Sequence, residues 1–143
     1  MPTRKISQII TNQRILVAAG DISVRAAAQL MAEARVGSIM IAANGKLVGI
    51  FTERDALNRV LATGLDPDQV RLSEVMTADP LSVSPDHQLG HALHMMYEGG
   101  FRHMPVVEDG APVGMVSSRD ALGRELSAFE EERERCDALS ERL

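Results

Sequence analysis

The sequence predicts a mixed α/β (α+β) fold of two pseudo-symmetric repeats, each ordered strand, helix, strand, strand, helix, with a further helix at the C-terminus. Two observations predict this fold. A block of thirteen residues occurs twice at an offset of 65, as GKLVGIFTERDAL over 45–57 and GAPVGMVSSRDAL over 110–122, with seven identical positions. Around both blocks, runs with the period of strands alternate with runs with the period of helices. Repeated units usually share a core, so the two halves are expected to pack together.

The repeat extends backwards from these blocks. The segment ISQIIT at 6–11 matches LSEVMT at 72–77 at an offset of 66, so the first copy has one additional residue before its first strand. We expect repeat 1 over 6–62, repeat 2 over 72–124 and a helical tail over 125–143. One half alone would bury its core poorly, whereas 143 residues are enough for one compact domain.

The first strand and first helix of each repeat follow from short local patterns. Residues 15–18 and 81–83 are β-prone runs that end in turn signals. Asp21 or Ser23 is expected to cap the first helix, and Asp86 the equivalent helix of repeat 2. Apolar residues recur at helical spacing in both helices, at Val24, Ala27, Ala28 and Met31 and at Leu89, Ala92, Leu93 and Met96.

Two tight turns and a second helix complete each repeat. Asn44-Gly45 and Asp109-Gly110 lie between β-rich runs, and such dipeptides favour a type I′ hairpin turn because both residues tolerate a positive φ. The last helix of each repeat is expected to begin at Thr52 or Ser117.

The passage into that last helix carries the chemistry of the repeat. Thr52-x-x-Asp55 and Ser117-x-x-Asp120 fit a capping box, which by itself implies only two well-capped helices. An aspartate at this position can also accept hydrogen bonds from two adjacent sugar hydroxyls, and a helix N-terminus attracts anions.

Two further features of the motif favour a ribose-phosphate site. Gly49 and Gly114 precede the hydroxyl residues by three positions, where a missing side chain would let a ligand approach the backbone. Arg54 and Arg119 lie in the first helical turn, an unfavourable place for a cation that has no anionic partner.

With these motifs the sequence resembles paired cystathionine-β-synthase (CBS) domains, and in particular small stand-alone bacterial proteins that contain little else. The resemblance covers about residues 6–124 and rests on the twice-matched motif and on the segments before it. It implies a Bateman module, in which two repeats pack through their sheets and leave two clefts that bind adenine nucleotides.

The resemblance also implies roles for individual residues. The hydroxyls of Thr52 and Ser117 would contact phosphate or ribose, and Asp55 and Asp120 would hold the ribose hydroxyls, beside Arg54 and Arg119. Arg102 and His103 would meet the phosphates. The base would lie against the strand that follows, at Ser38 and Ile39 in one copy and at Met104 and Pro105 in the other.

The two copies differ in charge at this point. Repeat 1 has Gly37-Ser38 where repeat 2 has Arg102-His103. Because cations attract phosphate, we expect one dominant site and one weaker or differently selective site.

Composition and missing motifs exclude several functions. The net charge of −5 argues against a nucleic-acid surface, no apolar run is long enough for a membrane span, and a single cysteine is typical of the cytoplasm. No catalytic motif is present, so we do not expect an enzyme. His87, His91 and His94 share one helix face, but no further ligand completes a zinc site, and no metal is expected.

The expected function is regulatory nucleotide sensing. AMP is the first candidate ligand, with ADP, ATP and NAD as alternatives; S-adenosylmethionine is disfavoured because its sulfonium is cationic. The alternative is a structural adaptor that binds no ligand. An unidentified protein effector would act in trans. Apolar residues spaced by seven along the tail, with two more alongside, favour a homodimer contact over a helix lying on its own domain: Leu122, Phe129, Cys136 and Leu143, with Leu126 and Leu139.

Overall fold

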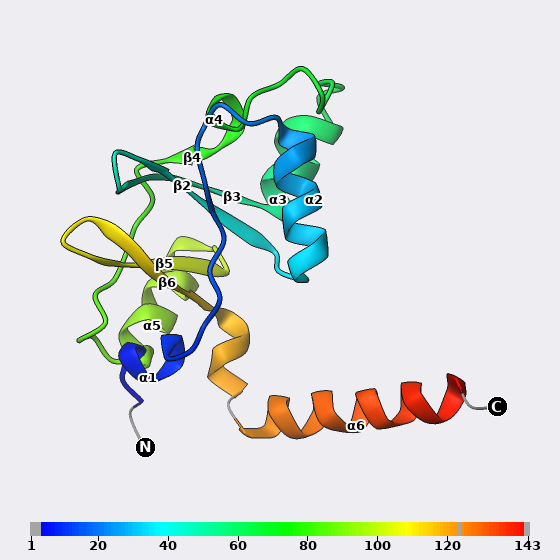
Figure 1. Ribbon diagram of the computed structural model, residues 1–143. Coiled ribbons are helices and arrows are strands. Elements are labelled where there is room, and N and C mark those ends of the chain that lie inside the picture. The colour runs from blue at the N-terminus through cyan, green and yellow to red at the C-terminus, as the bar shows by residue number, and fades with distance from the viewer. Residues whose placement is uncertain (1–3, 123, 142–143) are drawn as a thin grey trace.

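The computed structural model describes residues 4–122 and 124–141, and it confirms the mixed α/β fold of two repeats with a C-terminal helix (Figure 1). The first half contains β1 (Val17–Ala18), α2 (Val24–Ala34), β2 (Ser38–Ala43), β3 (Lys46–Thr52), α3 (Glu53–Asp55) and the π-helical turn η1 (Ala56–Leu61). The second half contains α5 (Leu89–Gly99), β5 (His103–Glu108), β6 (Ala111–Ser117) and the 3-10 helix η2 (Ser118–Leu122). The remaining elements are α1 (Ile6–Ile10), α4 (Leu72–Val75), β4 (Thr77–Ala78) and α6 (Arg124–Glu141).

The two central hairpins repeat each other in register and in turn. β1 pairs in parallel with β2, β2 pairs antiparallel with β3, and β5 pairs antiparallel with β6. Both predicted type I′ turns are confirmed, since φ is 53° and 77° at Asn44 and Gly45 and 53° and 81° at Asp109 and Gly110. The hairpin tips meet, because the Leu47 N–H donates to the Gly110 carbonyl at 2.9 Å.

The short leading helices are exchanged between the halves. α1 lies against β6 and α5 of the second half, while α4 lies against the first sheet (Figure 1). The Ile6 N–H donates to the His87 carbonyl at 2.9 Å, and the Leu72 N–H donates to the Ile22 carbonyl at 2.9 Å. Ile6 is buried in the second core, and Leu72 is buried in the first. Each core is therefore completed by the leading segment of the other repeat.

This exchange corrects the role predicted for the motif glycines. A Cβ at Gly49 would overlap the thioether of Met76, which follows α4, and a Cβ at Gly114 would lie 2.8 Å from the Cβ of Ile10 in α1. The missing side chains thus make room for the exchanged segments, and the expectation that they admit a ligand is wrong.

Other local predictions are wrong in detail. The strand predicted over 15–18 is only two residues long, and that over 81–83 is reduced to a single bridge between Val83 and Val106. Ser23 caps α2 by accepting from the Ala26 N–H at 3.1 Å, which confirms Ser23 over Asp21 as the predicted cap. Asp86, however, does not cap α5, whose first N–H is satisfied by the Arg4 carbonyl. Ala28 is exposed instead of joining the buried stripe of α2.

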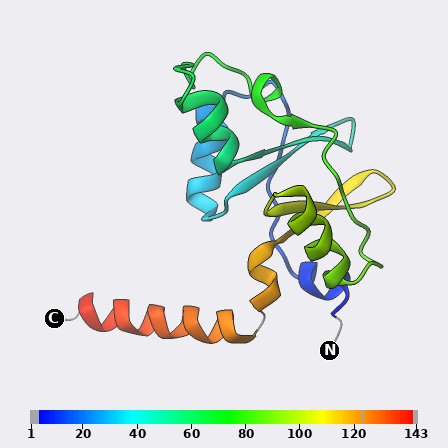
Figure 2. The same cartoon turned by 180° about the vertical axis from the view of Figure 1, so that it is seen from behind.

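Helix α6 extends away from the rest of the molecule in both views (Figures 1 and 2). Residues 131–139 are all exposed, so the alternative of a tail lying on its own domain is wrong for this part. Leu143 and the side chains of Leu126 and Phe129 lie outside the described part of the structure. Within the described residues, no helix combines the length and the apolar character needed to cross a bilayer. The expected cytoplasmic location stays a prediction.

Candidate functional site

The capping box forms as predicted at the start of α3. The Asp55 N–H donates to Thr52 Oγ1 at 3.3 Å, and the Thr52 N–H donates to Asp55 Oδ2 at 3.0 Å. The second copy retains half of this arrangement, in which the Ser117 N–H donates to Asp120 Oδ2 at 2.8 Å. Asp55 Oδ1 lies 3.5 Å from Arg59 Nε. Both aspartates are therefore held in fixed positions by the backbone of their own repeat.

A large cleft of about 800 Å³ lies between the two repeats and contains the first copy of the motif. Repeat 1 contributes the end of β3 and the start of the following helix. Repeat 2 contributes the loop after β4 and the start of β5. The lining residues are Ile50, Thr52, Glu53, Arg54, Asp55 and Leu57, then Thr77, Asp79, Pro80 and Leu81, and finally Phe101, Arg102 and His103. Thr52 and Asp55 of repeat 1 therefore line the same cleft as Arg102 and His103 of repeat 2.

A second cleft of about 110 Å³ takes the pseudo-symmetric position. The segment after α1, the loop between α2 and β2, and the second hairpin form its walls. The lining residues are Gln13, Arg14, Ile15 and Leu16, then Arg35, Val36, Gly37, Ser38 and Met40, and finally His103, Met115 and Arg119. This smaller cleft lacks Arg102 and offers far less space than the larger one.

The Gln13 side chain makes one edge of the smaller cleft different from the corresponding edge of the larger one. In the first half, the backbone of Thr77 in β4 pairs with Ile50 of β3. Met115 is equivalent to Ile50, but its partner is the amide of Gln13, which donates to the Met115 carbonyl at 2.8 Å and accepts from the Met115 N–H at 2.9 Å. A side-chain amide therefore replaces a strand at this edge and forms one wall of the smaller cleft.

The clefts also differ in charge. Two arginines and three carboxylates line the larger cleft, which gives a net charge of −1 with His103 neutral. Three arginines and no carboxylate line the smaller one. The residues that line the smaller cleft thus carry a net positive charge, whereas those that line the larger cleft carry a net negative charge.

His103 belongs to both clefts. Burial lowers the pKa of its imidazole, and the nearby cations Arg102 and Arg119 act in the same direction, while Glu53 and Asp120 oppose them. A neutral imidazole at this position can both donate and accept a hydrogen bond.

Arg54 has a structural partner that the sequence did not reveal. Its Nη1 donates to the Gly100 carbonyl at 3.0 Å, at the C-terminal end of α5. The negative end of the α5 dipole favours a cation there, so an anionic ligand is not needed to explain this arginine.

Some predicted site residues lie elsewhere. The side chains of Ile39, Met104 and Pro105 are buried in the core and line neither cleft, so their contact with a base stays a prediction. Ser117 and Asp120 are also absent from both linings. Conversely, the sequence analysis missed the loop after β4 and the basic residues Arg14 and Arg35, because only the packing of one repeat on the other brings them to the clefts.

The surroundings of His87 and His94 bear on the prediction that these histidines bind no metal ion. His87 Nδ1 accepts from the Ser84 N–H at 3.0 Å, and His94 Nε2 lies 3.1 Å from Glu98 Oε1. Across the described residues, no three His, Cys, Asp or Glu side chains gather closely enough to hold a metal ion. The exposed Cys136 lies on α6, far along the chain from both clefts.

Comparison with known families places the chain in a class. The family model of the CBS domain matches residues 6–62 and 72–126. The chain therefore belongs to the CBS-domain family, and its two repeats are a pair of CBS domains.

Individual relatives agree with this assignment. The CBS domain-containing protein CBSCBSPB3 of Arabidopsis thaliana is 37% identical over 115 residues, which is 80% of this chain but only 21% of that protein. This chain thus spans about a fifth of that relative.

Two solved structures combine a similar fold with a bound ligand. A CBS-domain protein of Pyrobaculum aerophilum complexed with AMP has a TM-score of 0.77 and 25% identity, and the match covers 88% of this chain and 96% of that one. The CBS domain pair of protein MJ0100, in complex with 5′-methylthioadenosine and S-adenosyl-L-methionine, has a TM-score of 0.76 and 26% identity, with 90% and 99% covered.

Proposed function

We propose that the protein is a regulatory module, not an enzyme, and that it binds an adenine nucleotide in the larger cleft. One observation carries this proposal. The larger cleft contains Thr52 and Asp55 from one repeat and Arg102 and His103 from the other, so a single ligand would contact both. Two structural relatives with bound adenosine compounds support the ligand class.

Asp55 is suited to the ribose even though it caps α3. An ionised carboxylate offers about four acceptor positions, and the Thr52 N–H and hydroxyl both contact a single oxygen, Oδ2. The remaining positions would accept hydrogen bonds from the two ribose hydroxyls. Arg102 and His103 would then meet the phosphate at the other side of the larger cleft.

The charge of the larger cleft favours AMP over ATP or NAD. Glu53, Asp55 and Asp79 line it, and each additional phosphate would add repulsion from these carboxylates. One phosphate is matched by Arg102 and Arg54. A nucleoside such as 5′-methylthioadenosine, which carries no phosphate, would bind through its base and ribose alone.

The regulatory role follows from the position of the ligand. A ligand that contacts both repeats stabilises the relative arrangement in which those contacts form. The resulting change would be read by a protein effector in trans or through a homodimer. A ligand-free adaptor, the alternative, would show no concentration-dependent rise in melting temperature with AMP.

The test is a titration of AMP and of adenosine into the wild type and Arg102→Ala. Loss of a charge-assisted contact to phosphate should weaken AMP binding about tenfold and leave adenosine binding nearly unchanged. Arg71→Ala is the matched control, since Arg71 is exposed and lines neither cleft. Equal AMP affinity in the wild type and Arg102→Ala would exclude the proposed phosphate position.

A further inference from the structure

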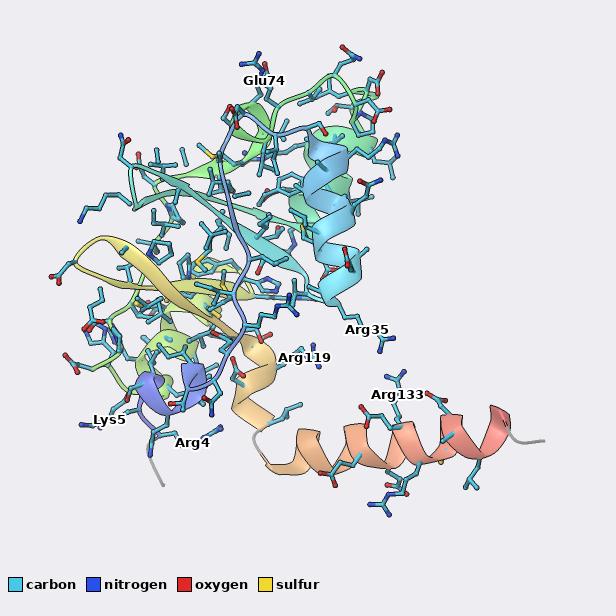
Figure 3. The ribbon with its side chains drawn as sticks, viewed as in Figure 1. Arg4, Lys5, Arg35, Glu74, Arg119 and Arg133 are labelled. Atoms are coloured by element: carbon cyan, nitrogen blue, oxygen red, sulfur yellow. The ribbon has the colours of Figure 1, made fainter. Side chains whose placement is uncertain are left out.

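We propose that Arg59 is a positioning residue of the larger cleft, which orients the Asp55 carboxylate for the ribose hydroxyls and links it to the segment that follows α4. This inference rests on the proposed nucleotide function and adds to it a residue that does not line the cleft. Glu74 marks the position of α4 in Figure 3, at the end of the molecule opposite to α6.

The Asp55 carboxylate is contacted at both of its oxygens. Oδ2 accepts from the Thr52 N–H at 3.0 Å and from the Thr52 hydroxyl at 3.3 Å, and Oδ1 lies 3.5 Å from Arg59 Nε. Contact at one oxygen alone would leave the carboxylate free to turn about its Cβ–Cγ bond, a torsion with broad energy minima. The cation beside Oδ1 therefore fixes the plane in which the carboxylate can meet two hydroxyls.

The distance between Arg59 and Asp55 leaves room for the ligand. At 3.5 Å the contact is an ion pair longer than an N–H···O hydrogen bond, so Arg59 attracts Oδ1 without filling its acceptor positions. The side chain of Asp55 is 13% exposed, whereas that of Arg59 is 49% exposed. A carboxylate that is largely shielded from water interacts more strongly with a nearby cation than an exposed one does. Loss of Arg59 should therefore be felt at Asp55.

The same guanidinium holds the end of α4 through another nitrogen. Arg59 Nη1 donates to the Met76 carbonyl at 3.0 Å and to the Val75 carbonyl at 3.4 Å. Carbonyls at the C-terminal end of a helix have no partner within the helix and carry the negative end of its dipole, so they favour a cation. One planar, fork-shaped side chain can serve the carboxylate and the carbonyls together, because its N–H groups point in different directions.

The segment held by Arg59 continues into a wall of the larger cleft. Met76 precedes β4, which pairs with β3, and Thr77 and residues 79–81 line the larger cleft. Arg59 thus connects the carboxylate to the start of this wall. A ligand that orders the carboxylate should therefore also order α4, although no residue of α4 lines either cleft.

The ordinary alternative is an i,i+4 ion pair on a helix, which contributes little to stability and does not affect a ligand. Two observations favour a positioning role. Arg59 lies in the π-helical turn η1, directly after the motif, and such turns are frequent at functional sites. The arginine also recurs in the sequence, since at the offset of 65 Arg59 corresponds to Arg124, whose side chain lies outside the described part of the structure.

Calorimetric titration of AMP and of 2′-deoxy-AMP into the wild type and Arg59→Gln tests this role. The two ligands differ in one ribose hydroxyl, so a change in the orientation of Asp55 should affect AMP more. We expect Arg59→Gln to weaken AMP binding about fivefold to tenfold and 2′-deoxy-AMP binding by less than about threefold. Arg59→Lys keeps the charge but not the fork, so it should recover part of the AMP affinity.

Arg25→Gln is the matched control, since it removes an arginine that pairs with Asp68 on the surface and lines neither cleft. Its affinity for both ligands should stay within about twofold of the wild type. An equal loss for AMP and 2′-deoxy-AMP in Arg59→Gln would overturn the positioning role, because a general structural defect affects both ligands alike.

Hydrogen exchange tests the link to α4. AMP should slow amide exchange over residues 72–76 in the wild type and should slow it less in Arg59→Gln. Equal protection of these residues in both proteins would overturn the link. Unchanged AMP affinity in Arg59→Gln beside a loss in Asp55→Asn would refute the role of Arg59 alone, whereas failure of AMP to bind the wild type would refute the nucleotide function on which that role rests.

Discussion

At the scale of single residues, Asp55 and Asp120 occupy equivalent positions in the two repeats but differ in their surroundings. Both accept a hydrogen bond from the backbone N–H of the hydroxyl residue three positions earlier. Only Asp55 lines a cleft, and its neighbours across that cleft come from the other repeat. The aspartate therefore caps the following helix in both repeats. On our proposal, it contacts a ligand only in repeat 1.

The lowered pKa of His103 predicts a pH dependence of stability. The unfolded chain binds the proton with the ordinary pKa of 6.5, whereas the folded protein binds it only at lower pH. The unfolded state is therefore favoured as pH falls through 6.5, and folding stability declines. Denaturant midpoints at about pH 7.5 and about pH 5.5 should fall more for the wild type than for His103→Gln. A larger fall in His103→Gln would contradict this assignment.

At the scale of elements, the exchanged leading helices fix the position of the two halves. α1 fits against Gly114 of β6, and the residue after α4 fits against Gly49 of β3. Because these contacts join segments far apart in the sequence, no local pattern indicates them. A glycine in a binding motif consequently suggested a ligand where the structure has a neighbouring helix.

Gly114→Ala tests this packing. The new methyl group would overlap Ile10, a β-branched residue with little rotamer freedom, so we expect a loss of about 1–3 kcal/mol in the free energy of unfolding. Ile10→Ala in the same chain should recover part of the loss, because it opens space for the methyl group. Gly49→Ala should cost less, since the Met76 side chain it meets is flexible. Chemical denaturation measures all three, and a neutral Gly114→Ala would refute the packing role.

Local signals explain which elements were predictable. Asn44-Gly45 and Asp109-Gly110 specify their turns within two residues, and both hairpins were predicted correctly. The box at Thr52 and Asp55 is equally local and was also predicted. The wall formed by Gln13 was not predicted, because a side-chain amide that replaces a strand depends on a partner far along the chain.

At the scale of the whole molecule, α6 is the element without an intramolecular explanation. Its residues 131–139 are exposed, and Leu139 is 60% exposed. Other large apolar side chains on the body are exposed as well, among them Leu61 and Tyr97. A second copy of the chain is the partner we propose for this surface, since the apolar residues of the tail recur every seven positions.

We predict that the full chain sediments as a homodimer at micromolar concentration. Leu139→Glu should shift it towards monomer, because a charge would be buried in an apolar contact. Ala138→Glu is the control, since one residue along a helix turns the side chain by about 100° onto another face. A monomeric wild type, or the same shift in both variants, would contradict the proposed contact.

The whole-molecule arrangement also explains why Arg102 lines the same cleft as the first copy of the motif. The sequence predicted two unequal sites from Arg102 and His103 but could not assign these residues to one copy of the motif. Packing of the repeats places them opposite Thr52 and Asp55, so residues of repeat 2 complete the site of repeat 1. An assignment of this kind depends on contacts between repeats, which neither spacing nor composition contains.

The central claim is that one adenine nucleotide binds in the larger cleft through Asp55. Calorimetric titration of AMP into the wild type, Asp55→Asn and Asp120→Asn tests it directly. Asparagine keeps an acceptor for the helix cap, so each variant should lose only about 1 kcal/mol of stability or less. We predict one AMP per chain, a loss of affinity of about tenfold to a hundredfold in Asp55→Asn, and little change in Asp120→Asn. Unchanged AMP binding in Asp55→Asn, or an equal loss in both variants, would contradict the account.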